Sequence, residues 1–558
     1  MIQRLVKNNF RVAVAQLNPV VGDIEGNFSL AVTAYRKAKE EGADLVSFTE
    51  LFMTAYPPED LVVRPAFIRA SGDAVKELAK VTKGGPGIII GAPLWHDGSI
   101  YNGAALLDEG QVVAEIFKSD LPNYAEFDEK RVFCAGSGSK PVAYRGVGLG
   151  IVICEDIWSN PSICAELSSR GAEIVFVLNG SPYRRNKTLK RIEIVRAQAI
   201  RSGVPVIYAN QVGGQDELVF DGGSFALDGK GKIVFQMKHF ESHIALSCWQ
   251  RQSTEWRCVS GPHESLFDGL AADYLACTLG LRDYVNKNNF EDVILGLSGG
   301  IDSALCAAMA VDVFGREKVR AVMMPYHYTS QESLKDAESC ARLLGCRYDV
   351  IPIVQPVEAF LNIMSPVFSG FSLDVTEENL QSRVRGTILM ALSNKFGSMV
   401  ITTGNKSEIA VGYATLYGDM NGGFNPIKDI YKTQVYALAE WRNKNYLDGF
   451  KGPKGTVIPS NIVVKAPSAE LRENQKDEDS LPAYPILDDI LQSLVEDDMS
   501  VGDVVKRGHL RETVKKIEHL LYLAEYKRRQ SAPGVKIGDK HFGRDRRYPI
   551  VNRFRDKS

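Results

Sequence analysis

The sequence predicts a two-domain α/β protein from three observations: the length of the chain, two different strand-and-helix patterns, and a break between them. A chain of 558 residues exceeds what one hydrophobic core usually supports, so two domains of roughly 250 to 300 residues are expected. In the first half, short β-rich runs alternate with amphipathic helical segments and a hairpin. In the second half, strands and helices alternate regularly, which is typical of a doubly wound parallel sheet.

The elements of the first half predict a mixed sheet. Apolar β-rich runs of strand length occur at residues 12–15, 43–48, 87–91, 100–107, 148–154, 174–178 and 204–210. Segments 27–41 and 189–202 carry apolar residues at helical spacing and a charged opposite face. The run 101–115 turns at Asp108-Glu109-Gly110, which is a hairpin signal. A hairpin among strands that helices separate indicates mixed rather than purely parallel pairing.

A polar stretch separates the two halves. Residues 249–267 contain Gly261-Pro262 and break the alternating pattern, so we expect domains at 1–250 and 267–558 with a linker at 251–266. The second half begins with an amphipathic helix at 266–287. A strand at 293–297, a helix at 304–314, a strand at 318–324 and a helix at 333–344 follow. This order predicts a nucleotide at the carboxyl ends of parallel strands.

Composition excludes several classes of partner. With 66 Lys and Arg against 68 Asp and Glu, the net charge of −2 gives no global field toward nucleic acid or an anionic membrane. The nine cysteines show no C-x-x-C pair and are typical of reduced thiols in a cytoplasmic protein. Residues 1–10 lack an apolar signal core, and no run of about 18 uncharged apolar residues occurs.

The hexapeptide Ser298-Gly299-Gly300-Ile301-Asp302-Ser303 lies where a predicted strand gives way to a helix. Adjacent glycines allow close backbone approach, and the N–H groups of a first helical turn bind phosphate. Ser298 and Ser303 can donate to phosphate oxygens, whereas Asp302 would repel phosphate unless a divalent metal lay between them. An ordinary turn without a ligand explains none of these extra residues. The sequence therefore predicts a site for a nucleoside triphosphate without the lysine of a Walker A loop.

This turn resembles the S-G-G-x-D-S pattern of the pyrophosphatase-loop family of ATP-using enzymes. The resemblance implies cleavage of ATP between its α- and β-phosphates, adenylation of an acid or amide oxygen, and later attack by an amine-type nucleophile. It also implies a Rossmann-like, doubly wound parallel-sheet domain.

Three residues of the first half each follow an apolar run: Glu50, Lys118 and Cys154. A thiol that attacks an amide needs a base, a cation or N–H donors for the oxyanion, and shelter from water, and these three residue types supply them. Taken singly, Cys154 is more often a small buried hydrophobe, and a lone Glu or Lys is usually solvated.

In this order the three contexts resemble the nitrilase superfamily over about residues 10 to 250. The resemblance implies an α-β-β-α sandwich with Glu50 as general base, Lys118 as stabiliser of the intermediate and Cys154 as nucleophile. It also implies that Glu129 is an accessory carboxylate. The glutamine-using branch further implies that Tyr124, Ser181 and Lys187 touch the amino-acid end of the substrate, although Lys187 could equally be solvated surface.

The fusion of these two parts resembles the family of glutamine-dependent NAD synthetases. The second half carries further segments of that pattern, among them Thr402-Thr403-Gly404-Asn405-Lys406-Ser407-Glu408 and Tyr417-Gly418-Asp419. The resemblance implies hydrolysis of glutamine, transfer of ammonia to a second site, and ATP-dependent amidation of deamido-NAD with release of AMP and pyrophosphate. It also implies a homo-oligomer.

Charge suggests how the ligands of the second half are held. Asp302 and Glu408 suit Mg²⁺ on the ATP phosphates, and Lys465 suits direct contact with phosphate. The resemblance adds Thr403 near ATP, and Asn379, Glu408 and Lys527 near deamido-NAD. Glu408 therefore stays open between metal and dinucleotide, and an exposed helix carboxylate is its third interpretation.

Two other functions fit parts of the sequence. The first is a nitrilase-type amidohydrolase whose second domain only senses nucleotide. The second is an RNA-modifying adenylating enzyme, for which the basic residues of segment 526–548 could form a nucleic-acid patch. We disfavour the second, because the near-zero net charge indicates no RNA-binding surface and Asp539 and Asp545 dilute the segment.

Overall fold

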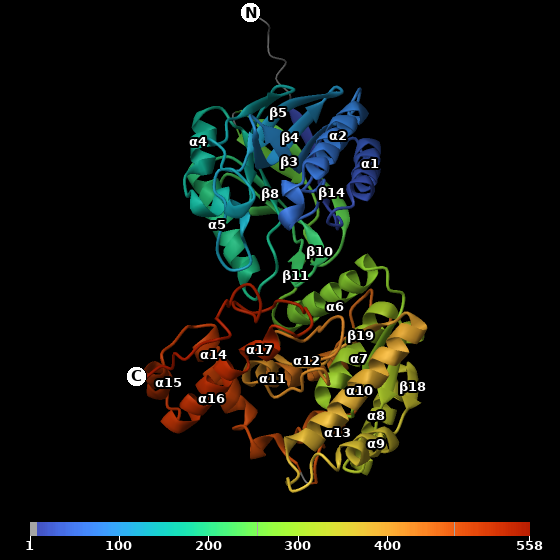
Figure 1. Ribbon diagram of the computed structural model, residues 1–558. Coiled ribbons are helices and arrows are strands. Elements are labelled where there is room, and N and C mark those ends of the chain that lie inside the picture. The colour runs from blue at the N-terminus through green and yellow to red at the C-terminus, as the bar shows by residue number, and fades with distance from the viewer. Residues whose placement is uncertain (1–7, 254, 474) are drawn as a thin grey trace, which may run out of the picture. The chain divides into compact units, whose positions relative to one another are not determined.

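The structure is a computed structural model that describes residues 8–253, 255–473 and 475–558 (Figure 1). The chain divides into two compact units, unit one ending at Asp268 and unit two beginning at Gly269. Residues 1–7, where we expect no signal core, lie outside the described residues. Among the helices described, none is both long enough and apolar enough to span a bilayer.

Unit one contains two large sheets, as predicted. The seven-stranded sheet has the order β15-β14-β1-β2-β3-β4-β5, and the six-stranded sheet has the order β13-β12-β9-β8-β7-β6. Strands β1, β2 and β3 pair in parallel, as do β7, β8 and β9, whereas the other neighbours are antiparallel. The mixed pairing is therefore confirmed. The strands are β1 (Asn9–Gln16), β2 (Leu45–Ser47), β3 (Gly87–His96), β4 (Ser99–Asp108), β5 (Gln111–Phe117), β6 (Val142–Tyr144), β7 (Val147–Ile153), β8 (Ile174–Asn179), β9 (Val206–Asn210), β12 (Phe225–Leu227), β13 (Ile233–Gln236), β14 (His243–Gln252) and β15 (Glu255–Ser260), with β10 (Val212–Gln215) and β11 (Leu218–Asp221) as a separate ribbon.

Alternate residues along the strands build a four-layer sandwich. On β1, Val12 and Val14 face a core shared with Ile151 and Ile153 of β7, so the two sheets pack face to face. The intervening Ala13 and Ala15 join a second core beneath α1 (Ile24–Glu40) and α2 (Pro65–Val81). A third core joins the outer face of the six-stranded sheet to α4 (Ile163–Ser169) and α5 (Lys187–Ser202), on the opposite side of unit one in Figure 1. The predicted α-β-β-α order is confirmed.

The expected linker at 251–266 differs from the structure. Residues Glu255–Ser260 form β15, which pairs antiparallel with β14 at the edge of the seven-stranded sheet. Trp256 is buried in the core between the sheets, which explains why a polar-looking segment continues the fold. The change from one unit to the other lies after Asp268, where α6 (Gly269–Lys287) begins.

Unit two contains a four-stranded parallel sheet with the order β18-β17-β16-β19. The first strand, β16 (Val293–Gly296), lies between the second, β17 (Val319–Met323), and the last, β19 (Met399–Ile401). The direction of winding reverses at β16, so a crevice opens at its carboxyl end, where the turn at 298–303 lies. Helix α7 (Ile301–Phe314) follows this turn and is buried on nearly all sides. The predicted doubly wound sheet is confirmed.

The remaining elements surround the sheet or form a separate helical cluster. Helices α14 (Tyr484–Val495), α15 (Val501–Lys506) and α16 (Arg511–Leu523) share an apolar core with α11 (Lys406–Val411) that includes Leu487, Val504 and Leu521, and the three helices gather on one side of unit two in Figure 1. The remaining elements of unit two are β18 (Arg347–Val350), α8 (Gln331–Leu344), α9 (Val354–Met364), α10 (Val375–Phe396), α11 (Lys406–Val411), α12 (Lys432–Lys444), α13 (Ser460–Val464), α14 (Tyr484–Val495), α15 (Val501–Lys506), α16 (Arg511–Leu523) and α17 (Glu525–Arg528); unit one also has α3 (Asp156–Ser159).

Candidate active sites

Cys154 lies directly after β7 in a backbone conformation that few side chains adopt. Its φ is 40°, and its N–H donates to the carbonyl of Leu178 at 2.9 Å. Burial raises the pKa of the Cys154 thiol well above its usual value; the charge of Glu50 adds to this effect, and Lys118 opposes it. The resting thiol is therefore protonated, and its attack on a carbonyl requires a base.

Lys118 is buried between two carboxylates. Its Nζ donates to Glu50 Oε1 at 2.8 Å and to Glu129 Oε1 at 2.7 Å. Burial alone would lower the pKa of this ammonium, but Glu129 and Glu50 hold it well above its usual value. Asn102 of β4 donates to Glu50 Oε1 at 2.8 Å, and Tyr56 donates to Glu129 Oε1 at 2.9 Å. Lys118 is thus a fixed positive charge, with both carboxylates oriented around it.

A buried aspartate ties the segment after Lys118 to the segment after Cys154. Asp156 Oδ1 accepts the backbone N–H groups of Ser119 at 3.0 Å and Asp120 at 2.7 Å. Burial raises the pKa of Asp156 to about 7, although these hydrogen bonds and Lys118 oppose the shift. Asp156, Tyr56 and Asn102 were not among the residues predicted from the sequence. The polar Asn102 within an apolar strand was the available signal.

Of the three expected glutamine contacts, Ser181 and Lys187 are buried and Tyr124 is half exposed. The Tyr124 side chain is 54% exposed, and its hydroxyl donates to the Glu155 carboxylate at 3.0 Å. Burial lowers the pKa of Lys187 to about 8, and its Nζ lies 5.6 Å from the centre of the Phe127 ring. The interpretation of Lys187 as solvated surface is therefore wrong.

Ser181 directly follows the residue whose backbone N–H contacts Glu50, the expected general base. It follows Gly180, whose N–H donates to Glu50 Oε2 at 2.8 Å. A Cβ atom at Gly180 would lie 2.9 Å from the ring of Tyr56, so only glycine fits there. Burial has the largest effect on the pKa values of Tyr124 and Lys187, and the charge that Cys154 would carry as a thiolate is a smaller influence on both, so both side chains lie within electrostatic reach of the sulfur. The structure therefore brings the expected catalytic and glutamine-binding side chains into one neighbourhood.

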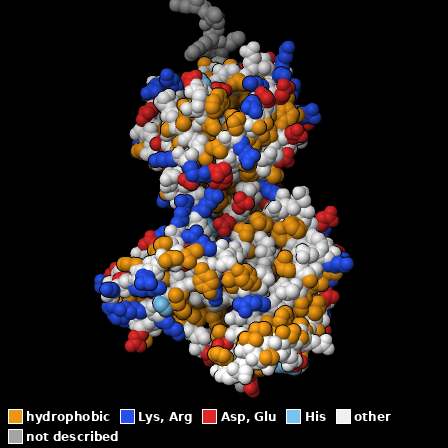
Figure 2. Space-filling view, in the orientation of Figure 1, with side chains coloured by type: hydrophobic (Ala, Val, Ile, Leu, Met, Phe, Trp, Pro, Cys, Tyr) orange, Lys and Arg blue, Asp and Glu red, His pale blue; other side chains and the backbone are white. Residues whose placement is uncertain are grey.

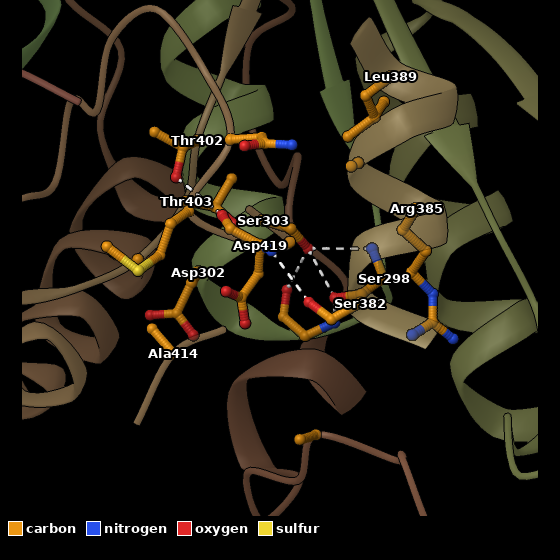
Figure 3. A pocket seen from close by; sticks show the side chains of 18 of the residues that line it. Ser298, Asp302, Ser303, Ser382, Arg385, Leu389, Thr402, Thr403, Ala414 and Asp419 are labelled. Atoms are coloured by element: carbon orange, nitrogen blue, oxygen red, sulfur yellow. Dashed lines mark hydrogen bonds between the residues drawn. The ribbon is translucent and has the colours of Figure 1, made fainter. Parts of the chain in front are cut away.

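In unit two, the turn at 298–303 closes on itself through its own hydroxyl groups. Ser298 Oγ accepts the N–H of Gly300 at 3.3 Å, and Ser303 Oγ lies 3.2 Å from Ser298 Oγ (Figure 3). Gly299 has a φ of 81°, and a Cβ atom there would lie 2.4 Å from the carbonyl oxygen of Ser333. This position therefore requires glycine. The turn borders two cavities of about 290 Å³ and about 500 Å³.

Asp302 and Glu408 share one lysine ammonium. Lys432 Nζ lies 2.5 Å from Asp302 Oδ2 and 3.1 Å from Glu408 Oε1. Asn405, the N-cap of α11, donates to Asp302 Oδ1 at 2.9 Å. Burial raises the pKa of Glu408 to about 7, with Lys432 opposing and Asp302 adding to the shift. Glu408 is therefore not the exposed helix carboxylate of the third interpretation. Lys432 was not among the residues predicted from the sequence.

The carboxylates of Asp302 and Glu408 fit a hard divalent cation. Mg²⁺ is typically held by one or two carboxylates and completes its shell with water and substrate phosphate. The described residues contain no group of three or more His, Cys, Asp or Glu side chains arranged to hold a metal by themselves. A metal at this position would therefore depend on oxygen ligands from the nucleotide.

The other expected nucleotide contacts lie on the two cavities. Thr403 borders the smaller cavity (Figure 3), whereas Asn379, Lys465 and Lys527 border the larger one. Lys465 Nζ donates to Ser333 Oγ at 2.9 Å. Asn379 Oδ1 accepts the Thr415 hydroxyl at 2.9 Å. These contacts fix the side chains in place beside the cavities.

Two further charged groups on the smaller cavity were missed. Burial lowers the pKa of Arg385 to about 10, and its Nε donates to the carbonyl of Met324 at 3.0 Å. Burial raises the pKa of Asp419 to about 6, while the N–H of Thr415 and the cations of Lys527 and Arg385 oppose the shift. Figure 3 shows Arg385 and Asp419 on the same cavity as Ser298. Asp419 belongs to a motif seen in the sequence, but no function was assigned to it.

The basic segment 526–548 is partly neutralised by its own neighbours. Arg528 and Arg546 both pair with Glu525, at 2.7 Å and 2.9 Å, and Lys536 pairs with Asp545 at 2.8 Å. Since these side chains are buried, the three cations are not available to a polyanion. Lys527 instead donates to the carbonyls of Gly412 and Ala414, at 2.8 Å and 2.7 Å.

Comparisons with known proteins match both units. Residues 11–257 match the carbon-nitrogen hydrolase family, and residues 274–531 match the NAD synthase family. The chain is 47% identical to a glutamine-dependent NAD(+) synthetase of Rhodobacter capsulatus, covering 99% of this chain and 100% of the relative. It is 44% identical to the Acinetobacter baylyi relative of the same name, covering 98% and 99%. A solved glutamine-dependent NAD+ synthetase from Acinetobacter baumannii, in complex with ADP, is 41% identical with a TM-score of 0.78, covering 98% of this chain and 99% of that chain.

Proposed function

The chain belongs to the family of glutamine-dependent NAD(+) synthetases, and from this premise we propose how its residues divide the reaction. It is a carbon–nitrogen ligase that takes its amide nitrogen from glutamine. Unit one, up to Asp268, is the glutaminase, and unit two, from Gly269, forms NAD. The observation that carries this assignment is the Lys118 ammonium buried between Glu50 and Glu129, in the unit that holds Cys154.

In the glutaminase, Cys154 is the nucleophile and Glu50 is the general base. Glu50 removes the thiol proton as the sulfur attacks the side-chain amide carbon of glutamine, and Lys118 stabilises the resulting oxyanion. The same proton then passes from Glu50 to the leaving nitrogen, so ammonia departs and a thioester remains. Glu50 next activates a water molecule that releases glutamate. Glu129 keeps Lys118 in place throughout.

The amino-acid end of glutamine binds to Tyr124, Ser181 and Lys187. Lys187 supplies a buried cation for the α-carboxylate, and its lowered pKa reflects how little solvent it retains. Ser181 supplies a hydroxyl, and Tyr124 lies at the exposed side. This set explains why an α-amino acid rather than a simple amide is the substrate.

In unit two, ATP binds with its phosphates on the turn formed by Ser298, Gly299, Gly300 and Ser303. Asp302 and Glu408 would hold Mg²⁺, which supplies positive charge to the phosphates. Thr403, Lys432 and Lys465 provide the remaining polar contacts of ATP. Asn379 and Lys527 bind deamido-NAD in the larger cavity, and Glu408, which borders both cavities, stands between the metal and the dinucleotide.

The chemistry of unit two is a carboxylate activation. The nicotinate carboxylate of deamido-NAD attacks the α-phosphate of ATP, and pyrophosphate leaves. Ammonia then attacks the acyl-adenylate carbon, and AMP leaves with formation of the amide. Little covalent chemistry falls to side chains here, so their contribution is positioning and charge.

A homo-oligomer in the cytoplasm completes the proposal. Apolar side chains on and after α9 are largely exposed: Ile363 at 71%, Val367 at 68%, Phe371 at 82% and Leu373 at 82%. Figure 2 shows hydrophobic side chains gathered over the part of unit two that holds α9 and α10. A patch of this kind is typical of a protein–protein interface. Sedimentation that finds an active monomer would refute the oligomer.

One assay tests the function. Purified protein with glutamine, ATP, Mg²⁺ and deamido-NAD should form NAD, AMP and pyrophosphate in equal amounts. An amidohydrolase that only senses nucleotide would release glutamate without pyrophosphate. That alternative is not favoured, because the NAD synthase family matches residues 274–531.

A further inference from the structure

A fully buried ion pair lies behind Ser181. Arg191 of α5 is 1% exposed, and Asp221 at the end of β11 is 0% exposed. The guanidinium donates two hydrogen bonds to the carboxylate, from Nη1 to Oδ2 at 3.1 Å and from Nη2 to Oδ1 at 3.2 Å. The carboxylate also accepts the Thr188 hydroxyl at 3.1 Å and the Asn210 amide at 3.3 Å. Asp221 therefore fixes the plane of the guanidinium.

The same guanidinium reaches forward to Ser181. Arg191 Nη2 donates to Ser181 Oγ at 3.3 Å and to the Ser181 carbonyl at 3.2 Å. Asn210 completes the hold, because its Oδ1 accepts the Ser181 N–H at 3.0 Å and its Nδ2 donates to the carbonyl at 3.2 Å. Arg191 and Asn210 thus fix the backbone of Ser181, and Arg191 also donates a hydrogen bond to the oxygen of its hydroxyl group.

This arrangement decides what the Ser181 hydroxyl can do. An arginine side chain has only donors, so Ser181 Oγ must be the acceptor in their contact. The hydroxyl proton is then available to another acceptor. The buried Tyr208 hydroxyl is one such neighbour of Ser181, and the carboxylate of an amino-acid substrate is a stronger acceptor because it is charged. A hydroxyl without such a partner could turn and offer either its proton or a lone pair.

Stability alone is a weak explanation for this ion pair. Removing two charges from water costs free energy that their attraction often fails to recover, so a buried pair frequently stabilises no more than apolar side chains would. A pair that holds a substrate-contacting group has a separate reason to be present. Gly180, next to Ser181, also donates its N–H to Glu50, so the same support extends to the general base.

We propose that Arg191 and Asp221 are positioning residues of the glutaminase, which fix the Ser181 hydroxyl as a hydrogen-bond donor to the α-carboxylate of glutamine. This inference rests on the proposed contact between Ser181 and glutamine. Neither side chain touches the reacting atoms, and both act through Ser181.

A double-mutant cycle tests the proposal. Arg191→Lys keeps the positive charge but loses the planar guanidinium that contacts both Asp221 and Ser181. Ser181→Ala removes the hydroxyl. Each single variant should lower kcat/KM for glutamine by about tenfold, mainly through KM, since each loses one hydrogen bond to a charged group. The double variant should be no worse than Ser181→Ala alone. Asp221→Asn should lower kcat/KM for glutamine by as much as Arg191→Lys does. If Arg191→Lys does not fold, Asp221→Asn is used in its place.

Glutamate release at saturating glutamine requires a folded unit one, so a kcat near the parent value reports that each variant is folded, and ammonia-driven NAD synthesis in unit two should stay at the parent rate. Arg196→Lys on the same helix is the matched control, because Arg196 donates to the carbonyl of Gly231 at 3.1 Å and should leave kcat/KM unchanged. If the fold-losses in kcat/KM of the two single variants multiply in the double variant, the two residues act independently. That result would overturn the proposal and indicate a structural function for Arg191. If Ser181→Ala has no effect on KM, the contact between Ser181 and glutamine fails. If only Arg191→Lys and Asp221→Asn have no effect, the positioning inference fails.

Discussion

The thiol site of unit one and the phosphate-turn site of unit two differ in how far their own side chains satisfy one another. In unit one, Lys118 lies between two carboxylates, and Glu50 accepts hydrogen bonds from Asn102 and Gly180. In unit two, the polar side chains border cavities of about 290 Å³ and 500 Å³. There, Asp302 and Glu408 share the one ammonium of Lys432.

The difference follows from what each substrate brings. The amide group of glutamine carries no charge, so the charges that act on its carbonyl must be assembled beforehand in a site with little water. ATP and a dinucleotide bring several negative charges and a metal, so their site must leave room and offset those charges. The unit-one site thus supplies charges that the uncharged amide lacks, and the unit-two site supplies positive charge to offset the anionic nucleotides.

Cys154→Ala tests the separation of the two sites most strongly. Without the sulfur no thioester forms, so glutamine-driven NAD synthesis should fall by about 10⁴-fold or more, while ammonia-driven synthesis stays largely intact. Initial rates with glutamine and with ammonium chloride measure both. Cys164→Ala, a buried cysteine of α4, is the control and should keep both activities. Loss of both activities in Cys154→Ala would mean that Cys154 is structural.

Asp302→Ala should affect the phosphate-turn site of unit two and leave the thiol site of unit one unchanged. Loss of this carboxylate removes a proposed metal ligand, so synthesis from either nitrogen source should fall by about 10³-fold. Glutaminase activity, measured as glutamate release in the absence of ATP, should remain. Ammonia-driven turnover at the parent rate would contradict the metal function of Asp302.

Lys432→Met should have an intermediate effect. Removing the ammonium leaves Asp302 and Glu408 to repel each other, so KM for Mg-ATP should rise by roughly 10- to 100-fold through misplaced ligands. Steady-state kinetics with varied Mg-ATP measure this change. Lys444→Met at the far end of α12 is the control, because Lys444 is exposed and pairs only with Glu440 among the described residues. An unchanged KM would show that Lys432 does not organise the site.

The pH dependence of Lys187 should give the smallest effect. Burial lowers its pKa to about 8, so the ammonium is complete below that pH and is lost as the pH rises through it. Above pH 8, kcat/KM for glutamine should therefore fall by about tenfold per unit if this charge binds the α-carboxylate. Lys187→Arg should remove the fall, because a guanidinium stays charged. A flat profile in the parent enzyme would contradict the contact between Lys187 and glutamine.

The architecture was largely predictable because strands, helices and turns each leave a pattern within a short stretch of sequence. Continuous apolar runs of strand length predicted β1, β7 and β8, and the Gly-Gly turn after β16 predicted a phosphate site at the carboxyl end of that strand. The boundary at 251–266 was wrong because Trp256 is one buried residue in a polar segment, and a single burial leaves no periodic trace. The separate core of α14 to α16 was not predicted for a similar reason, since which helices share a core depends on contacts far apart in sequence.

Among the site residues, those in recognisable motifs were foreseen and those that support them were not. Cys154 and Asp302 follow strands in distinctive contexts, whereas Lys432 lies 130 residues from the aspartate that it contacts. Asn102 on β4 donates to Glu50, and Asp156, the first residue of α3, holds the backbone that follows Lys118. No spacing rule links such partners, because only folding sets their distances.

The sequence by itself determined the sandwich architecture of unit one, the doubly wound architecture of unit two, and which residues are expected to carry the thiol and phosphate chemistries. These features depend on residue type and on spacing along the chain, which the sequence records directly. Only the tertiary structure decided that Lys118 sits between two carboxylates, that Lys432 joins Asp302 to Glu408, and that Arg191 and Asp221 lie behind Ser181. Charge, burial and pKa at these points depend on neighbours that are remote in sequence and close only in the fold.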